Sequence, residues 1–162
     1  MRRSKPRVFL DSSALIAAIF SPREDSASRQ LLRLGESALV ELRVNREVLR
    51  DTEYLIRKRK PALLAIFALL LDQSHVEVVA DASQKLVELC LEMTGYLPDA
   101  RVLAAAVECD ADVFATYDTE HFLQNPLIGP PRTRLRVLNA PQTVAWYLAL
   151  MQDPAQETKE DV

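Results

Sequence analysis

The chain has 162 residues, of which 49% are hydrophobic and 27% charged, and its formal net charge at pH 7 is -3. This length and composition fit one globular domain with its own hydrophobic core. We predict that this domain spans residues 1–152 and that a polar tail follows over residues 153–162. The slightly acidic balance excludes a uniformly basic nucleic-acid-binding surface, although local basic clusters are present.

Three features of the sequence favour a cytoplasmic protein. Cys90 and Cys109 show neither CxxC spacing nor the density of a disulfide-rich secreted domain. Asp11 interrupts the apolar run near the start of the chain, which is not typical of a signal peptide. Residues 62–71 are the most apolar stretch, but they are about half the ~20 residues that a membrane-spanning helix requires. We therefore predict a buried helix or a partner-binding groove there, and no membrane association.

The predicted elements alternate between strands and helices along the chain. Short apolar or β-branched runs predict strands, and stretches with helical spacing of apolar residues predict helices. We predict strands over residues 8–10, 38–44, 76–80, 112–116 and 135–138. We predict helices over residues 12–19, 26–36, 46–60, 62–71, 83–94, 99–109 and 141–151. This alternation predicts an α/β protein, a three-layer α/β/α sandwich with a mostly parallel central sheet.

Residues with strong positional preferences set the predicted helix boundaries. Asn45 and Asp81 are expected to cap the helices that follow them. Gly35 and Gly95 are expected to end the helices that precede them.

Three aspartates lie where a parallel sheet would collect them. Asp11 follows the first predicted strand, Asp118 follows the fourth, and Asp99 opens the helix that leads into that fourth strand. Ligands of open α/β sheets bind outside the carboxyl ends of the strands, so these acids are expected at one edge. Crowded carboxylates repel one another unless a cation neutralises them, and an all-oxygen set suits Mg²⁺ or Mn²⁺ better than Zn²⁺.

A fourth acid can come from the helix that begins at residue 46. Glu47 and Asp51 are spaced i, i+4 and share one helix face, so either can point toward the same site. Each acid also has a simpler interpretation. Asp11 can be a helix N-cap, Asp99 a first-turn acid, Asp118 a turn residue, and the two helix acids part of a solvated face.

A divalent ion at such a cluster can lower the pKa of a bound water and hold a phosphate oxygen, which is the chemistry of phosphodiester hydrolysis. Basic clusters at residues 57–60, with Arg46 and Arg50, and at Arg132, Arg134 and Arg136 can neutralise RNA phosphates. A solvated surface is an equal explanation for them. Few aromatic residues accompany these clusters, so recognition of bases by stacking is not predicted.

The sequence resembles the PIN-domain nucleases, including the toxin components of prokaryotic toxin–antitoxin pairs. The likeness spans roughly residues 7–150 and is carried by three segments. These are VFLDSSALIAAIF, VNREVLRDTEYLI and PDARVLAAAVECDADVFATYDTEHF. The last is the most specific, because an aspartate opens an Ala-rich helix and a threonine stands two residues before the final aspartate.

The resemblance implies a set of metal-binding catalytic residues. They are Asp11, Asp51, Asp99 and Asp118. The family usually has Glu at the second position, so Asp51 departs from the pattern and Glu47 is its rival. Ser13 and Thr116 are expected to hydrogen-bond to the acids or to a phosphate. Glu120 is expected at the surface, and His121 is expected to pack together with Phe122.

The sequence therefore predicts a cytoplasmic, Mg²⁺- or Mn²⁺-dependent endoribonuclease, and the family that it resembles includes the toxins of toxin–antitoxin pairs. The resemblance implies a single-stranded or structured RNA substrate, a cognate antitoxin protein and a homodimer. The alternative is a catalytically silent RNA-binding or protein-interaction module with the same fold. Haloacid-dehalogenase chemistry is less favoured, because Ser13 stands where that family has its second acid. With three glycines in the chain, no Gly-rich phosphate-binding loop is present.

Overall fold

The computed structural model describes residues 4–129 and 132–152. The predicted tail, residues 153–162, lies outside the described residues. The strands are β1 (Arg7–Leu10), β2 (Glu41–Val44), β3 (Glu77–Val78), β4 (Val113–Ala115) and β5 (Arg136–Leu138). The α-helices are α1 (Ser12–Phe20), α2 (Ala27–Glu36), α3 (Arg46–Arg59), α4 (Leu64–Gln73), α5 (Gln84–Thr94), α6 (Leu97–Glu108) and α7 (Ala140–Gln152). A 3-10 turn (Pro61–Leu63) precedes α4, and a single π-helical turn (Thr119–Leu123) follows β4.

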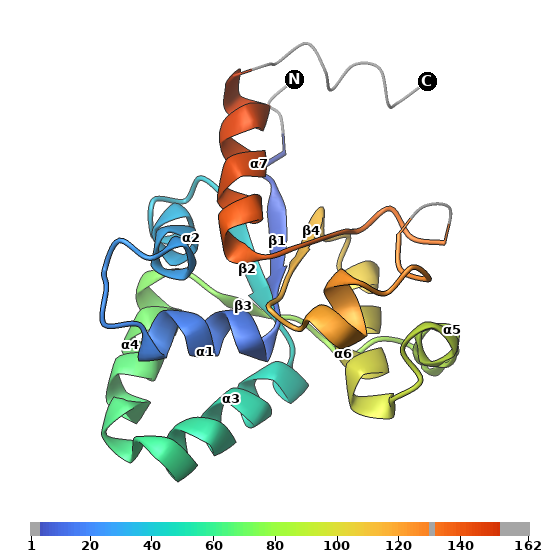
Figure 1. Cartoon of the computed structure of the whole chain (residues 1–162), viewed down its shortest axis with the longest axis horizontal. Helices are drawn as coiled ribbons and strands as arrows, with labels where there is room; N and C mark the ends of the chain where they lie inside the picture. Colours follow the sequence, from blue (N-terminus) through green and yellow to red (C-terminus); the bar gives the residue numbers. More distant parts are fainter. Residues whose placement is uncertain (1–3, 130–131, 153–162) are drawn as a thin grey trace.

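One parallel sheet organises the described part of the chain. Its strand order is β3-β2-β1-β4-β5, and each of these neighbouring pairs is parallel. Figure 1 shows α1 and α2 on one side of this sheet and α5 and α6 on the other. The predicted α/β fold with a parallel sheet between helices is confirmed. Because every strand runs the same way, the segments that follow β1 and β4 leave the sheet at the same edge.

Several predicted boundaries are wrong for local reasons. The strand predicted over 38–44 begins only at Glu41, because Ala38 has a positive φ of 55° that breaks the extended path. The strand predicted over 76–80 is reduced to β3. Asp81 does not cap the next helix; the Ser83 hydroxyl does, accepting a hydrogen bond from the Leu86 backbone N–H. Gly95, as predicted, ends α5 in the left-handed conformation with φ of 69°.

Gly35 lies inside α2 instead of ending it. Its lack of a side chain lets β2 and the residue that follows α4 approach its backbone closely. A Cβ at this position would lie 2.5 Å from Leu42 Cδ1 and 2.6 Å from the Ser74 carbonyl oxygen. We expect Gly35→Ala to lower the free energy of unfolding by about 1–3 kcal/mol, although alanine is the better helix former. Urea denaturation checks this, and unchanged stability would show that α2 can move away from β2.

The apolar helix predicted over residues 62–71 is buried on one face only, where Leu64, Leu70 and Leu71 pack against the core beside Phe67. Phe67 is its buried side chain in α4, whereas Ile66 is 42% and Leu69 is 53% exposed. The buried-helix prediction therefore holds for one face of α4, and the other face is exposed and apolar. None of the helices in the described ranges is both long and apolar enough to cross a membrane.

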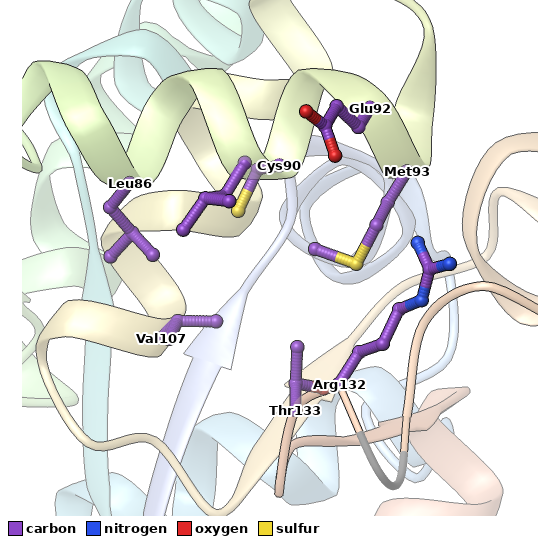
Figure 2. A pocket seen from close by; sticks show the side chains of 8 residues that line it. Leu86, Cys90, Glu92, Met93, Val107, Arg132 and Thr133 are labelled. Carbon is purple, nitrogen blue, oxygen red and sulfur yellow. The ribbon is translucent and has the colours of Figure 1, made fainter.

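A small apolar cavity lies between α5, α6 and the segment that leads into β5. Its volume is about 310 Å³, and Figure 2 shows Leu86, Cys90, Met93 and Val107 around it, with Arg132 at one side. Burial raises the pKa of the Cys90 thiol to about 11, so this cysteine is an unreactive, protonated thiol at neutral pH. None of the predicted site residues lines this cavity.

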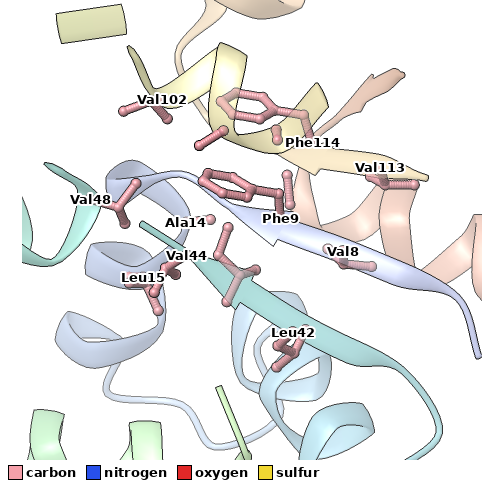
Figure 3. Close-up of a cluster of buried hydrophobic side chains, with 14 of the residues drawn as sticks. Val8, Phe9, Ala14, Leu15, Leu42, Val44, Val48, Val102, Val113 and Phe114 are labelled. Carbon is pink, nitrogen blue, oxygen red and sulfur yellow. The ribbon is translucent and has the colours of Figure 1, made fainter. Parts of the chain in front are cut away.

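The central core fixes the ends of β1 and β4 relative to each other. Figure 3 shows Phe9 and Phe114 side by side on these neighbouring strands, and their rings stack with centroids 5.8 Å apart. Both side chains are fully buried. Val48 of α3 and Val102 of α6 pack into the same cluster. The core thereby brings α3 and α6 to the edge of the sheet where β1 and β4 end.

Candidate functional site

Asp11 is the buried acid of the site. It follows β1, its backbone N–H donates to the Ala115 carbonyl at 2.9 Å, and its residue is 7% exposed. It stands at the N-cap position of α1, but its side chain makes no capping hydrogen bond. The helix-cap interpretation of Asp11 is therefore wrong. Burial raises the pKa of this carboxyl, while hydrogen bonds from Thr116 and Ser13 oppose that rise.

Two hydroxyls hold the Asp11 carboxylate. Ser13 Oγ donates to Asp11 Oδ2 at 2.9 Å, and Thr116 Oγ1 donates to the same oxygen at 2.8 Å. Each hydroxyl also accepts a backbone N–H, from Tyr117 at 2.9 Å and from Asp118 at 3.0 Å respectively. Because a hydroxyl has a single proton, both protons are directed at one carboxylate oxygen. The network orients Asp11 and joins the end of β4 to the start of α1.

Asp99 has the least satisfied carboxylate at this edge. It is an acid of the first turn of α6, and its Oδ2 is buried without a hydrogen-bond partner. Burial raises the pKa of the Asp99 carboxyl, His121 opposes this, and the charges of Asp118, Asp11 and Asp51 raise it further. These four aspartates, which we call the acidic cluster, therefore act on one another electrostatically.

The Asp118 carboxylate contacts His121, a partner that the sequence did not predict. It caps the π-helical turn, and its Oδ1 accepts the His121 backbone N–H at 3.0 Å. His121 Nδ1 lies 2.9 Å from Asp118 Oδ2, and this carboxylate raises the pKa of His121. The prediction that His121 packs with Phe122 is wrong, because Phe122 is buried while His121 is exposed. Glu120 is exposed, as predicted.

The geometry separates the two candidate acids of α3. Asp51 is exposed, its pKa is raised by partial burial, and its charge acts on Asp99. Glu47 is 17% exposed and lies 3.9 Å from Arg101 of α6, with which it forms an ion pair. Asp51 is thus the α3 acid whose charge raises the pKa of Asp99, whereas the ion pair of Glu47 with Arg101 links α3 to α6.

The family model described as PIN domain matches residues 8–125, which include the whole acidic cluster. The chain belongs to the PIN-domain family. No curated protein shows significant sequence similarity to it.

Solved structures share the fold of this PIN domain at low sequence identity. The structure of VapBC2 from Rickettsia felis bound to a DNA fragment from their promoter superposes with a TM-score of 0.57 and 18% identity, covering 81% of this chain and 98% of that chain. VapC20 from Mycobacterium tuberculosis, a sarcin-ricin loop cleaving toxin, superposes with a TM-score of 0.53 and 17% identity, covering 70% of this chain and 92% of that chain. PAE2754 from Pyrobaculum aerophilum superposes with a TM-score of 0.59 and 15% identity, covering 90% of this chain and 99% of that chain.

The donor chemistry of this PIN domain fits a hard divalent cation. Asp99 Oδ2 is a buried oxygen that lacks a donor, and burial and mutual repulsion raise the pKa values of Asp11 and Asp99. Among the described residues, no three His, Cys, Asp or Glu side chains are arranged to hold an ion directly. Asp118 instead contacts His121. An ion would add the missing positive charge among oxygen donors of the kind that Mg²⁺ and Mn²⁺ prefer.

Proposed function

We propose that this PIN domain is a Mg²⁺- or Mn²⁺-dependent endoribonuclease that acts in the cytoplasm as the toxin of a toxin–antitoxin pair. The observation that carries the proposal is the Asp99 carboxylate, whose buried Oδ2 has no partner and whose neighbours are three further acids. Family membership supports it, as do the structural neighbours, one of which is a toxin that cleaves the sarcin-ricin loop.

In this proposal Asp11, Asp99 and Asp118 would draw together around the cation when it binds, because the described side chains are not arranged to hold it directly in its absence. Asp51 would complete the set. A bound divalent ion supplies Lewis acidity and neutralises the charge of a phosphate. Ser13 and Thr116 keep the Asp11 carboxylate in one orientation and favour its ionised form by donating both hydroxyl protons to it. Arg46 and Arg50 lie exposed on the helix that carries Asp51, where they can attract the RNA backbone.

The direct test is cleavage of single-stranded RNA by the full chain. We expect cleavage to require Mn²⁺ or Mg²⁺ and to stop when EDTA is added. A silent RNA-binding module would bind the same RNA and leave it intact under both conditions, and that result would overturn the proposal. Gel analysis of the products distinguishes internal cuts from removal of end nucleotides.

The choice between the α3 acids gives a separate prediction. We expect Asp51→Asn to reduce the cleavage rate by about 10–100-fold, because it removes a charge that acts on Asp99. We expect Glu47→Gln to change the rate by less than about threefold, since its partner is Arg101. The reverse order of the two initial rates, measured at one Mn²⁺ concentration, would assign the second acid to Glu47.

The proposal also includes protein partners. A cognate antitoxin would cover the acidic cluster and keep RNA away from it. A second copy of the chain is proposed to cover the exposed apolar face of α4, where Ile66 and Leu69 lie. The mass of the purified protein, measured by light scattering, tests the homodimer.

A further inference from the structure

The exposed aromatic side chains of this protein gather on the segments that carry the acidic cluster. Among the described residues, three large aromatic side chains are exposed: Tyr54 at 65%, Tyr96 at 58% and Tyr117 at 38%. Each stands within three residues of a cluster acid in the sequence. Tyr147, which is far from those acids in the sequence, is buried. Sequence analysis did not predict this arrangement, because few aromatic residues accompany the basic clusters.

Tyr54 extends the site along α3. It lies three residues after Asp51, and side chains with this spacing are neighbours on one helix face, about 5–6 Å apart at Cβ. The Lys58 ammonium lies over the Tyr54 ring, 6.0 Å from its centroid. An acid, an exposed aromatic ring and a cation therefore follow one another along α3, at Asp51, Tyr54 and Lys58. Proteins that bind single-stranded nucleic acids combine rings for base stacking with cations for phosphates in the same way.

Tyr96 and Tyr117 lie close in sequence to two other acids of the acidic cluster, Asp99 and Asp118. Tyr96 is the N-cap residue of α6, immediately before the first turn that contains Asp99. Tyr117 lies between Thr116 and Asp118, its backbone N–H donates to Ser13 Oγ, and its hydroxyl contacts Ser28 Oγ at 3.1 Å. That contact anchors the ring of Tyr117, whereas the high exposure of Tyr54 and Tyr96 leaves their rings open to a ligand.

We propose that Tyr54 and Tyr96, on two of the segments that carry the acidic cluster, are stacking platforms for unpaired RNA bases, so that the substrate must present bases outside a duplex. The inference rests on the proposed nuclease function and names how its substrate is held. A protein interface explains the tyrosines less well, because Lys58 lies over one face of the Tyr54 ring and lysine is depleted from interface cores. Bases in an RNA duplex stack on each other and cannot reach the rings.

The test compares two labelled probes in EDTA, so that binding is measured without cleavage. One probe is a short single-stranded oligoadenylate, and the other is an abasic ribose-phosphate strand of the same length. We expect Tyr54→Ala and Tyr96→Ala to weaken binding of the oligoadenylate by about five- to tenfold each, measured by fluorescence anisotropy. We expect both substitutions to leave binding of the abasic strand unchanged, because phosphate contacts do not involve the rings.

Two control variants sharpen this test. Tyr54→Phe keeps the ring and is expected to bind oligoadenylate within about twofold of the unmodified protein. Leu148→Ala removes an exposed apolar side chain from α7 and is expected to have no effect. Equal losses on both probes, or no loss on either, would overturn the stacking proposal. So would tyrosine variants that change only the mass of the protein in solution, since that result assigns the rings to a protein interface.

The stacking proposal and the nuclease proposal fail in different ways. Ring-dependent binding of oligoadenylate without any Mn²⁺-dependent cleavage supports the stacking platforms and overturns the nuclease. Mn²⁺-dependent cleavage with binding that is insensitive to both tyrosines supports the nuclease and overturns the platforms.

Discussion

Asparagine in place of Asp99 is expected to abolish Mn²⁺-dependent cleavage of single-stranded RNA, with a rate loss of at least about 10²–10³-fold. The physical reason is that Asp99 contributes the buried carboxylate oxygen that has no partner within the protein. Asparagine keeps the size of the side chain but removes the charge that would attract the cation. The measurement is the initial rate of cleavage at saturating Mn²⁺ for the variant and the unmodified protein.

The stability of this variant separates a lost function from a lost fold. Asp99 is repelled by Asp118, Asp11 and Asp51, so removing its charge relieves repulsion. We therefore expect Asp99→Asn to have a Tm in EDTA equal to or above that of the unmodified protein. Asp72→Asn is the matched control, because Asp72 is exposed on α4, and it should cleave at the normal rate. Full activity in Asp99→Asn would remove the acidic cluster from the mechanism.

The positions of the site acids were largely predictable, because they depend on short-range patterns and one topological rule. Asp11 comes directly after an apolar strand, and Asp118 follows the next strand in the sheet order. Parallel pairing of β1 with β4 then brings both acids to one edge. The resemblance also predicts that Thr116 hydrogen-bonds to the acids, and the structure shows its hydroxyl donating to Asp11 at 2.8 Å.

Contacts between distant segments were not predictable from the sequence. Helical spacing leaves Glu47 and Asp51 equivalent and the resemblance places Asp51 in the set with Glu47 as its rival, but only the packing of α3 on α6 shows that Glu47 meets Arg101. His121 was assigned to packing because it precedes an aromatic residue. The π-helical turn instead returns its ring to Asp118. Such a turn has no strong sequence signal, since its hydrogen bonds depend on the local backbone path.

The same limitation explains why the aromatic residues near the site were missed. A count of aromatic residues beside basic clusters finds Tyr54 near residues 57–60, but Tyr96 and Tyr117 come from two other segments. Their common feature is a sequence distance of at most three residues from an acid of the cluster. Scanning for aromatic residues next to candidate acids, in place of candidate cations, would have found all three.

The stability of the cation-free protein should rise when Asp11 is replaced by asparagine. Burial raises the pKa of Asp11, so the folded chain holds its proton to a higher pH than the unfolded chain does. The contribution of Asp11 to the free energy of unfolding therefore falls as the pH rises from about 3.9, the usual pKa of aspartate, through the raised pKa of the folded chain. It stays lower at neutral pH, where the buried charge is uncompensated. The asparagine oxygen can still accept the hydroxyls of Ser13 and Thr116.

The measurement is the difference in Tm between Asp11→Asn and the unmodified protein, taken in EDTA from pH ~4 to pH ~8. We expect a positive difference at neutral pH that shrinks toward acid pH, where Asp11 itself becomes protonated. Each kcal/mol gained should raise Tm by about 2–4 °C for a chain of this length. A lower Tm for Asp11→Asn across the range would mean that the hydroxyl network, and not relief from a buried charge, decides the stability here.

Adding Mn²⁺ should reverse the order of the two proteins, because a cation that binds only the folded state stabilises it by mass action. At a concentration about 100 times the dissociation constant, this contribution is about 2.7 kcal/mol, or roughly 5–10 °C in Tm. Asp11→Asn lacks the buried charge that the cation would neutralise and should gain little. Equal gains in both proteins would place the bound cation away from Asp11. The charge that destabilises the cation-free fold would then have no role in holding the ion.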